Sequence, residues 1–156
     1  MKNVYFPDEE VTADDLYFVC YMVERVARQL KQPNKYGVNS IGKQGLREKL
    51  SLANVLHCEN PDSVAHDWIE AYGLQQGEYD VTNVDAKYTD RIPTATQMGK
   101  VYCRLIISTL QESEDYADGL NRVYNHPIAE IIDDYNSSAY YEPSYVLTRG
   151  YWAGGF

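Results

Sequence analysis

The segment from Thr12 to Pro33 limits the possible folds more than any other part of the sequence. Its start has the Thr12-x-x-Asp15 pattern of a capping box, and Pro33 predicts where it ends. Apolar residues recur between them at helical spacing, at Leu16, Val19, Cys20, Val23, Ala27 and Leu30. Further apolar side chains cover the other faces of the first half, at Tyr17, Phe18, Tyr21 and Met22. A helix that is apolar nearly all round is either buried at the centre of a helical core or forms a surface for a partner.

Cap residues and apolar periodicity predict further helices over residues 46–56, 61–72, 94–109, 116–124 and 127–135. Residues 34–44 are rich in Gly and Asn and predict a loop, and residues 75–93 predict an irregular segment with a short strand at 79–84. Gly99 interrupts the predicted helix 94–109, which indicates a close contact with another helix. Residues 137–156 form an aromatic, glycine-rich C-terminal tail. We therefore expect a single all-α domain, residues 1–156, with five or six helices, since the length is typical of one domain.

Charge is distributed unevenly along an acidic chain. The sequence has 14 Lys and Arg against 23 Asp and Glu, and this net charge of −9 argues against a general nucleic-acid binder. Residues 25–49 hold seven basic side chains and one acid, Glu48, whereas residues 112–142 hold eight acidic side chains and one base, Arg122. Either these regions pair or remain solvated, or one of them steers a charged partner. The basic segment at 25–49 leaves a local nucleic-acid contact open.

Targeting signals and membrane segments are not predicted. The N-terminal residues lack the basic and apolar regions of a secretory signal, and no apolar run approaches the roughly 20 residues of a membrane span. The three cysteines, Cys20, Cys58 and Cys103, have no paired spacing, and an odd number of them is typical of a reducing compartment. We expect a cytoplasmic protein that does not contact a membrane.

Two motifs for phosphate or metal binding are incomplete. Residues 37–43 match the G-x-x-x-x-G-K pattern of a phosphate-binding loop, but Gln44 stands where magnesium binding requires Ser or Thr, and no apolar strand precedes the loop. His57 and His66, with Cys58, Glu59 and Asp67 beside them, are separated by a predicted helix break and do not share one helical face. The sequence therefore predicts no metal site and no cofactor.

Arg122 and His126 form the candidate catalytic pair. The segment Arg122-Val123-Tyr124-Asn125-His126 resembles the Arg–His signature of the HEPN ribonucleases, which are all-helical. The resemblance implies that the pair would activate and stabilise attack on a phosphate. Three residues separate Arg122 from His126, fewer than is usual in those motifs, and Pro127 follows directly. The alternative is that Arg122 pairs with Asp118 one turn earlier and that His126 closes the turn.

Tyrosine is unusually frequent, with fifteen Tyr against three Phe and two Trp, and many tyrosines lie in the acidic C-terminal third. Tyr offers a large contact area, a polar group and little rotamer entropy to lose, so it is enriched at interfaces. The residues that we predict to bind a partner are Tyr116, Asp118, Tyr135, Tyr140, Tyr141, Glu142, Tyr145, Tyr151 and Trp152. The alternative is that the tyrosines pack against the rim of the domain's own core.

Residues 16–24, LYFVCYMVE, are followed by Leu56-His57 and by the pattern Val64-x-x-Asp67-x-Ile69-Glu70-x-Tyr72. These stretches resemble a small bacterial domain of unknown function that is encoded beside ADP-ribosyltransferase-like toxins. The resemblance covers residues 16–72, with a longer insert at 32–45, and brings no catalytic residues. It implies a role beside a toxin, as a neutraliser or an accessory protein.

These features together predict a non-catalytic, cytoplasmic protein-interaction domain. The expected type is an acidic antitoxin, immunity protein or defence inhibitor, and the expected partner is a protein such as a basic toxin or effector. The alternative is a HEPN-like helical ribonuclease or toxin component that uses Arg122 and His126.

Overall fold

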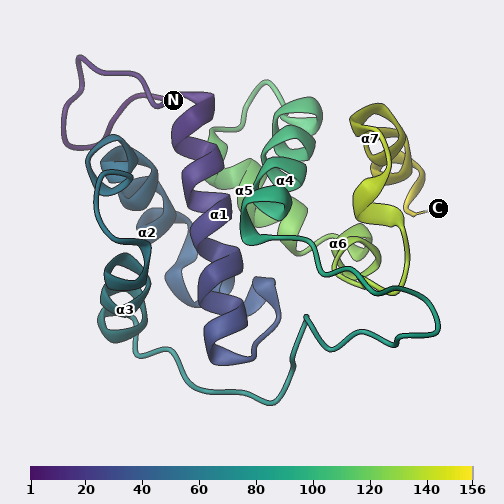
Figure 1. The fold of residues 1–156 in the computed structure, drawn as a ribbon. Helices are drawn as coiled ribbons and strands as arrows, with labels where there is room; N and C mark the ends of the chain where they lie inside the picture. Colours follow the sequence, from purple (N-terminus) through teal and green to yellow (C-terminus); the bar gives the residue numbers. More distant parts are fainter. Residues whose placement is uncertain (156) are drawn as a thin grey trace.

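Seven α-helices and one short 3-10 helix build the part of the chain that the structure describes, residues 1–155 of a computed structural model (Figure 1). They are α1 (Ala13–Leu30), α2 (Asn34–Leu56), α3 (Pro61–Ala71), α4 (Ala95–Thr109), α5 (Tyr116–Tyr124), α6 (Pro127–Ile132), the 3-10 helix η1 (Ala139–Tyr141) and α7 (Ser144–Ala153). Within residues 1–155 no β-strand forms, and extended backbone pairs only in an isolated bridge between Lys2 and Glu10. The prediction of an all-α fold is confirmed. None of the helices described combines the length and the apolar character that crossing a bilayer requires.

Helix α1 forms the centre of the core. It packs against α2, α3 and α4, and Figure 1 shows it between α2 and α3 on one side and α4 and α5 on the other. Thr12 and Asp15 form the predicted capping box: Asp15 N donates to Thr12 Oγ1 at 3.3 Å, and Thr12 N donates to the Asp15 carboxylate at 2.8 Å. Leu16, Val19 and Met22 are completely buried, so burial explains the apolar surface of this helix.

Gly99 allows α4 to approach α1 closely. A Cβ atom at this position would lie 3.0 Å from the backbone N and Cα of Tyr21. The backbone of a helix moves much less readily than the end of a side chain, so any larger residue would push the two helices apart. The close helix contact predicted from this glycine is confirmed.

The loop predicted over residues 34–44 is wrong, because this segment is helical from Asn34 onward. The side chain of Asn34 is buried and donates to Glu24 and Asp133, so tertiary contacts outweigh the weak helix propensity of the segment. Gly42 has a φ of 76°, which breaks α2 into two segments at a kink. The match to a phosphate-binding loop therefore lies within a kinked helix and not after a strand.

Two further predictions, both in the second half of the chain, are corrected by the structure. The strand predicted at 79–84 does not form. The chain is instead held to the end of α1 by two backbone hydrogen bonds: Gly77 N donates to Leu30 O at 2.8 Å, and Tyr79 N donates to Lys31 O at 2.9 Å. Helix α6 ends at Ile132, before the predicted end at 135. The aromatic tail predicted at 137–156 forms η1 and α7 within the described residues, and α7 packs against α4.

Candidate functional site

The nine residues predicted to bind a partner divide into buried and exposed groups. The rings of Tyr135 and Tyr151 lie in the core, with 1% and 6% of their surface exposed. Three more are half-buried: Tyr116, Asp118 and Tyr140. The exposed ones lie on or between η1 and α7: Tyr141, Glu142, Tyr145 and Trp152. Tyr135 and Tyr151 therefore serve the core, as the alternative interpretation of the tyrosines expects, and only the exposed group is fully accessible to a partner.

Tyr135 belongs to a buried polar network around α1. Its hydroxyl donates to Glu24 Oε1, and Arg28 Nη2 donates to the same hydroxyl at 3.2 Å. Arg28 also pairs with Glu24 Oε1, at 3.0 Å from Nη2 and 3.1 Å from Nε, and donates to Pro93 O at 2.6 Å. Glu24 is only 1% exposed, so Arg28 and Tyr135 supply the partners that a buried carboxylate requires.

A second buried carboxyl group, Asp133, lies beside Glu24. Asn34 Nδ2 bridges the two, donating to Glu24 Oε2 at 2.8 Å and to Asp133 Oδ2 at 3.1 Å. The Tyr102 hydroxyl donates to Asp133 Oδ1 at 2.6 Å. Burial, together with the nearby charge of Glu24, raises the pKa of Asp133 well above its ordinary value. The network therefore joins α1, α2 and α4 to the end of α6.

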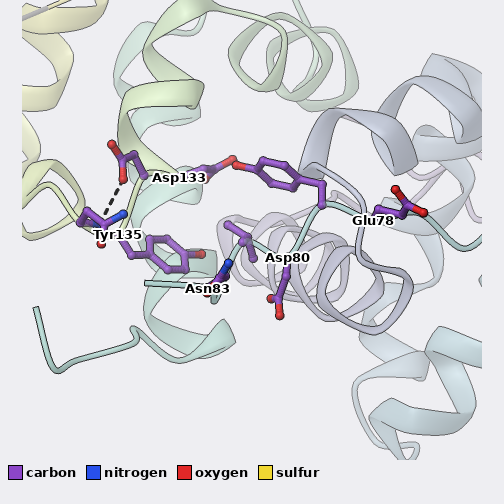
Figure 2. Close-up of a pocket in the computed structure, with 9 residues that line it drawn as sticks. Glu78, Asp80, Asn83, Asp133 and Tyr135 are labelled. Carbon is purple, nitrogen blue, oxygen red and sulfur yellow. Dashed lines mark hydrogen bonds between the residues drawn. The ribbon is translucent and has the colours of Figure 1, made fainter. Parts of the chain in front are cut away.

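Asp133 and Tyr135 line a hollow of about 350 Å³ on the surface (Figure 2). Its other acidic residues come from the α3–α4 connection and from the end of α6: Glu78, Asp80 and Asp134. No Lys or Arg is among its lining residues. We call it the acidic hollow. The sequence offered one signal for the network beneath it, the single carboxylate of Glu24 within the apolar pattern of the first helix.

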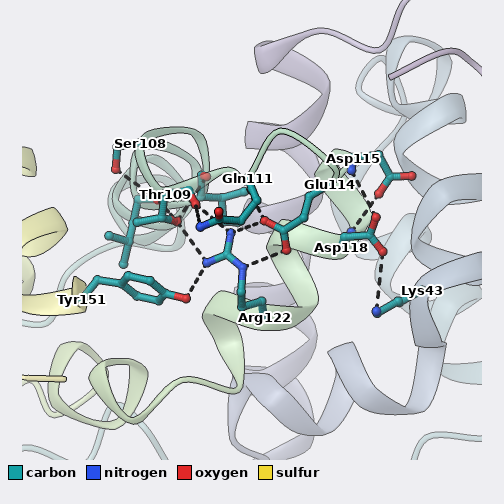
Figure 3. Close-up of polar contacts among 11 residues, drawn as sticks. Lys43, Ser108, Thr109, Gln111, Glu114, Asp115, Asp118, Arg122 and Tyr151 are labelled. Atoms are coloured by element: carbon teal, nitrogen blue, oxygen red, sulfur yellow. Dashed lines mark hydrogen bonds and ion pairs between the residues drawn. The ribbon is translucent and has the colours of Figure 1, made fainter. Parts of the chain in front are cut away.

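Arg122 holds the end of α4 to α5 and α7 (Figure 3). Its guanidinium donates to the two carboxylate oxygens of Glu114 at 2.7 and 2.9 Å, to Thr109 O at 3.0 Å and to the Tyr151 hydroxyl at 2.5 Å. The hydrogen bonds with Arg122 lower the pKa of Glu114, and the same bonds raise the pKa of Arg122. The alternative pairing of Arg122 with Asp118 is not observed, since Asp118 pairs with α2.

His126 lies next to this clamp and also has a structural role. Its ring centroid is 4.1 Å from that of Tyr151, and its Nδ1 accepts from Ile128 N at 3.1 Å as the N-cap of α6. Burial and the positive charge of Arg122 lower the pKa of His126. Arg122 and His126 therefore both contact Tyr151. Each also has a structural partner, because Arg122 forms an ion pair with Glu114 and His126 caps α6.

The basic and acidic regions of the chain face each other across α2 and α5. Arg47 donates to Asp115 at 2.7 Å and to Asp118 at 2.9 Å, and Lys43 Nζ lies 3.6 Å from Asp118 Oδ1. Figure 3 shows Lys43 directed at Asp118. At these positions the two regions pair within the molecule, which reduces the basic charge that residues 25–49 offer to an external partner.

Each of the two histidines outside the Arg122 clamp contacts a residue four positions away in the chain. His57 Nδ1 lies 3.0 Å from Ala53 O in its own helix, and His66 Nε2 lies 3.3 Å from Glu70 on the exposed face of α3. Among residues 1–155, no group of three or more His, Cys, Asp or Glu side chains is placed to hold a metal ion.

Three adjoining hollows form a groove along α4, η1 and α7. Their volumes are about 210, 380 and 540 Å³. The first and second share Tyr140 and Tyr141, and the second and third share Ser144. We call this surface the aromatic groove, after its aromatic lining residues Tyr88, Tyr140, Tyr141, Tyr145 and Trp152. Tyr141 and Tyr145 are each 68% exposed and Trp152 is 59% exposed, so large aromatic surfaces face solvent here.

The charged side chains of the aromatic groove are mostly basic: Arg91, Lys100, Arg104, Arg149 and the single acid Glu142. Lys100 and Arg104 lie one turn apart on the exposed face of α4, and the Arg149 guanidinium carbon lies 5.7 Å from the centroid of Tyr145. Sequence reasoning missed these cations. Their only signal was the spacing of Lys100 and Arg104, since nothing in the sequence places residues 88–91 beside residues 137–141.

The network around Glu24 is buried and the half-buried Arg122 is held by partners within the molecule, whereas the aromatic groove is open to solvent. Comparison of the chain with models of protein families, with curated proteins and with solved structures found no match. The aromatic groove is therefore the candidate functional site on the strength of its geometry.

Proposed function

We propose that this chain is a non-catalytic protein-interaction domain that binds its protein partner at the aromatic groove. The observation that carries the proposal is the exposure of Tyr141, Tyr145 and Trp152 along adjoining hollows. Exposed apolar surface that continues over several residues is typical of a binding site, and Tyr and Trp are the residues that most often dominate binding energy.

The proposed type is an antitoxin, immunity protein or defence inhibitor that acts in the cytoplasm of a bacterial cell. The use of Arg122 and His126 in a clamp and a helix cap supports a binding protein over a ribonuclease. The thiols of Cys20, Cys58 and Cys103 are all free, as is typical of a reducing compartment.

The test of the proposed function is capture of the partner by variants of the groove. Tyr145→Ala/Trp152→Ala removes two exposed rings from the groove, and Tyr5→Ala/Phe6→Ala removes two similarly exposed rings from the N-terminal segment as a matched control. We expect the wild-type chain and the control to capture the same protein from cells of the source organism, and the groove variant to lose it. A cooperative thermal unfolding transition is required of both variants, as the control for folding. Capture that is equal for all three chains would refute the proposal.

Catalysis is tested separately with RNA. We expect purified wild-type chain to leave total cellular RNA intact. Cleavage that is present in the wild type and absent in His126→Ala would overturn the non-catalytic assignment in favour of a ribonuclease.

A further inference from the structure

The aromatic groove has a charge opposite to that of the chain as a whole. The net charge of the chain is −9, yet the charged residues of the groove are four cations and one acid. A binding surface usually carries a potential complementary to that of its partner, which speeds association and excludes partners of the same sign. The positive charge of the groove therefore favours an occupant with negatively charged groups.

The cations of the groove are available to an external partner. Elsewhere in the molecule, basic residues such as Arg28, Arg47 and Arg122 are held in ion pairs with acidic side chains. By contrast, no ion pair between residues 1–155 involves Lys100, Arg104 or the other groove cations. Carboxylates of a partner can meet them without first displacing an internal acid.

The exposed rings set a second requirement on the occupant. Tyr145 and Trp152 line the hollow of about 540 Å³ together with Thr148 and Arg149. Apolar side chains of a partner would bury against these rings, whereas a purely charged segment would leave them in contact with water. The occupant must therefore combine carboxylates with apolar side chains.

A protein segment satisfies these conditions better than a nucleic-acid strand. Single strands also bind grooves that combine cations with aromatic rings, but they carry a charge at every nucleotide. The acidic hollow adjoins the groove at Asn136, which lines both, and its carboxylates Glu78, Asp80 and Asp134 would repel a continuous phosphate backbone. A protein segment can confine its carboxylates to the stretch beside the groove cations.

We infer that the occupant of the aromatic groove is an acidic segment of the protein partner, with carboxylates against Lys100 and Arg104 and apolar side chains against Tyr145 and Trp152. This inference rests on the proposed function and replaces the basic partner expected from the net charge. It assigns the groove a negatively charged ligand although the chain itself is acidic.

The inference is tested by selecting binders from a library of displayed random peptides. The selection uses the wild-type chain, Lys100→Glu/Arg104→Glu, and the control Lys2→Glu/Lys31→Glu, which makes the same change in net charge at exposed positions outside the groove. We expect the wild type to enrich peptides that contain both acidic and apolar residues. Their affinity should fall about tenfold with the groove variant and with added salt, and should stay within about twofold with the control.

Three results would overturn the inference. The first is a selection that yields no binders or yields basic peptides. The second is equal affinity of the selected peptides for the wild type and for Lys100→Glu/Arg104→Glu. The third is binding of labelled oligothymidine or oligouridine that this variant abolishes, which would identify a nucleic-acid strand as the occupant.

The failure of this inference can be told apart from the failure of the proposed function. If Tyr145→Ala/Trp152→Ala loses the cellular partner but Lys100→Glu/Arg104→Glu retains it, the groove binds a protein and only the acidic nature of the segment is refuted. If Tyr145→Ala/Trp152→Ala retains the partner, the proposed function itself is refuted.

Discussion

Replacement of Tyr135 by Phe removes one hydroxyl group from the buried network and leaves the ring in place. The hydroxyl donates to Glu24 Oε1 and accepts from Arg28 Nη2 at 3.2 Å, and Tyr135 is only 1% exposed. The change therefore removes two hydrogen bonds, but Glu24 keeps Arg28 and Asn34 as partners and Arg28 keeps Glu24 and Pro93 O. Because Arg28 retains two acceptors, we attribute most of the loss to the bond donated to Glu24. A hydrogen bond of this kind contributes about 1.5–3 kcal/mol to the free energy of unfolding.

Tyr140→Phe is the matched control for this change. Tyr140 is half-buried, its ring centroid lies 5.6 Å from that of Tyr135, and its hydroxyl makes no hydrogen bond within residues 1–155. We expect its free energy of unfolding to stay within about 0.5 kcal/mol of the wild type.

Urea unfolding followed by circular dichroism measures both variants, and equal m-values show that the unfolded states are comparable. For a chain of this length, the loss expected for Tyr135→Phe lowers Tm by roughly 3–12 °C. A Tyr135→Phe variant as stable as Tyr140→Phe would refute the reasoning, because it would show that the Tyr135 hydroxyl is not needed in the core.

Three further predictions concern stability and reactivity. Arg122→Lys keeps the positive charge but loses the paired hydrogen bonds to Glu114, so we expect urea unfolding at pH 7 to show a free energy of unfolding lower by about 1–3 kcal/mol. This difference from the wild type should shrink as the pH falls through the lowered pKa of Glu114, because the protonated carboxyl group no longer pairs with Arg122. Gly99→Ala should lower Tm, because its Cβ meets the backbone of α1, whereas Gly37→Ala, with nothing within 4 Å, should raise the free energy of unfolding by up to about 1 kcal/mol. A thiol reagent should modify Cys58 rapidly in the folded chain and leave the two buried cysteines unmodified until urea is added.

The helices that pack around the centre were the most predictable part of the fold. The capping box predicted at Thr12 forms, and Asn60 and Thr94 cap the helices predicted to begin at residues 61 and 94, because these side chains satisfy backbone groups of their own segment. Local signals of this kind lie within a few residues and can be read directly from the sequence.

The parts that were mispredicted depend on distant contacts. Helix α2 begins at Asn34 because this side chain binds Glu24 and Asp133, and residue 133 lies 99 positions further along the chain. In the same way, the basic side of the aromatic groove arises where α4 meets η1 and α7. Composition located the aromatic tail, but only the packing of the tail on α4 shows which tyrosines are exposed.

The buried network also imposes an order on folding during synthesis. Glu24 lies in the first helix, and the hydroxyl that completes its hydrogen bonds belongs to a residue 111 positions later. At about 5–20 residues per second, a ribosome needs roughly 6–22 s to add those residues. Throughout that interval Glu24 lacks one of the hydrogen-bond partners that it has in the folded protein, so the buried network of α1 closes only after most of the last third of the chain has been made.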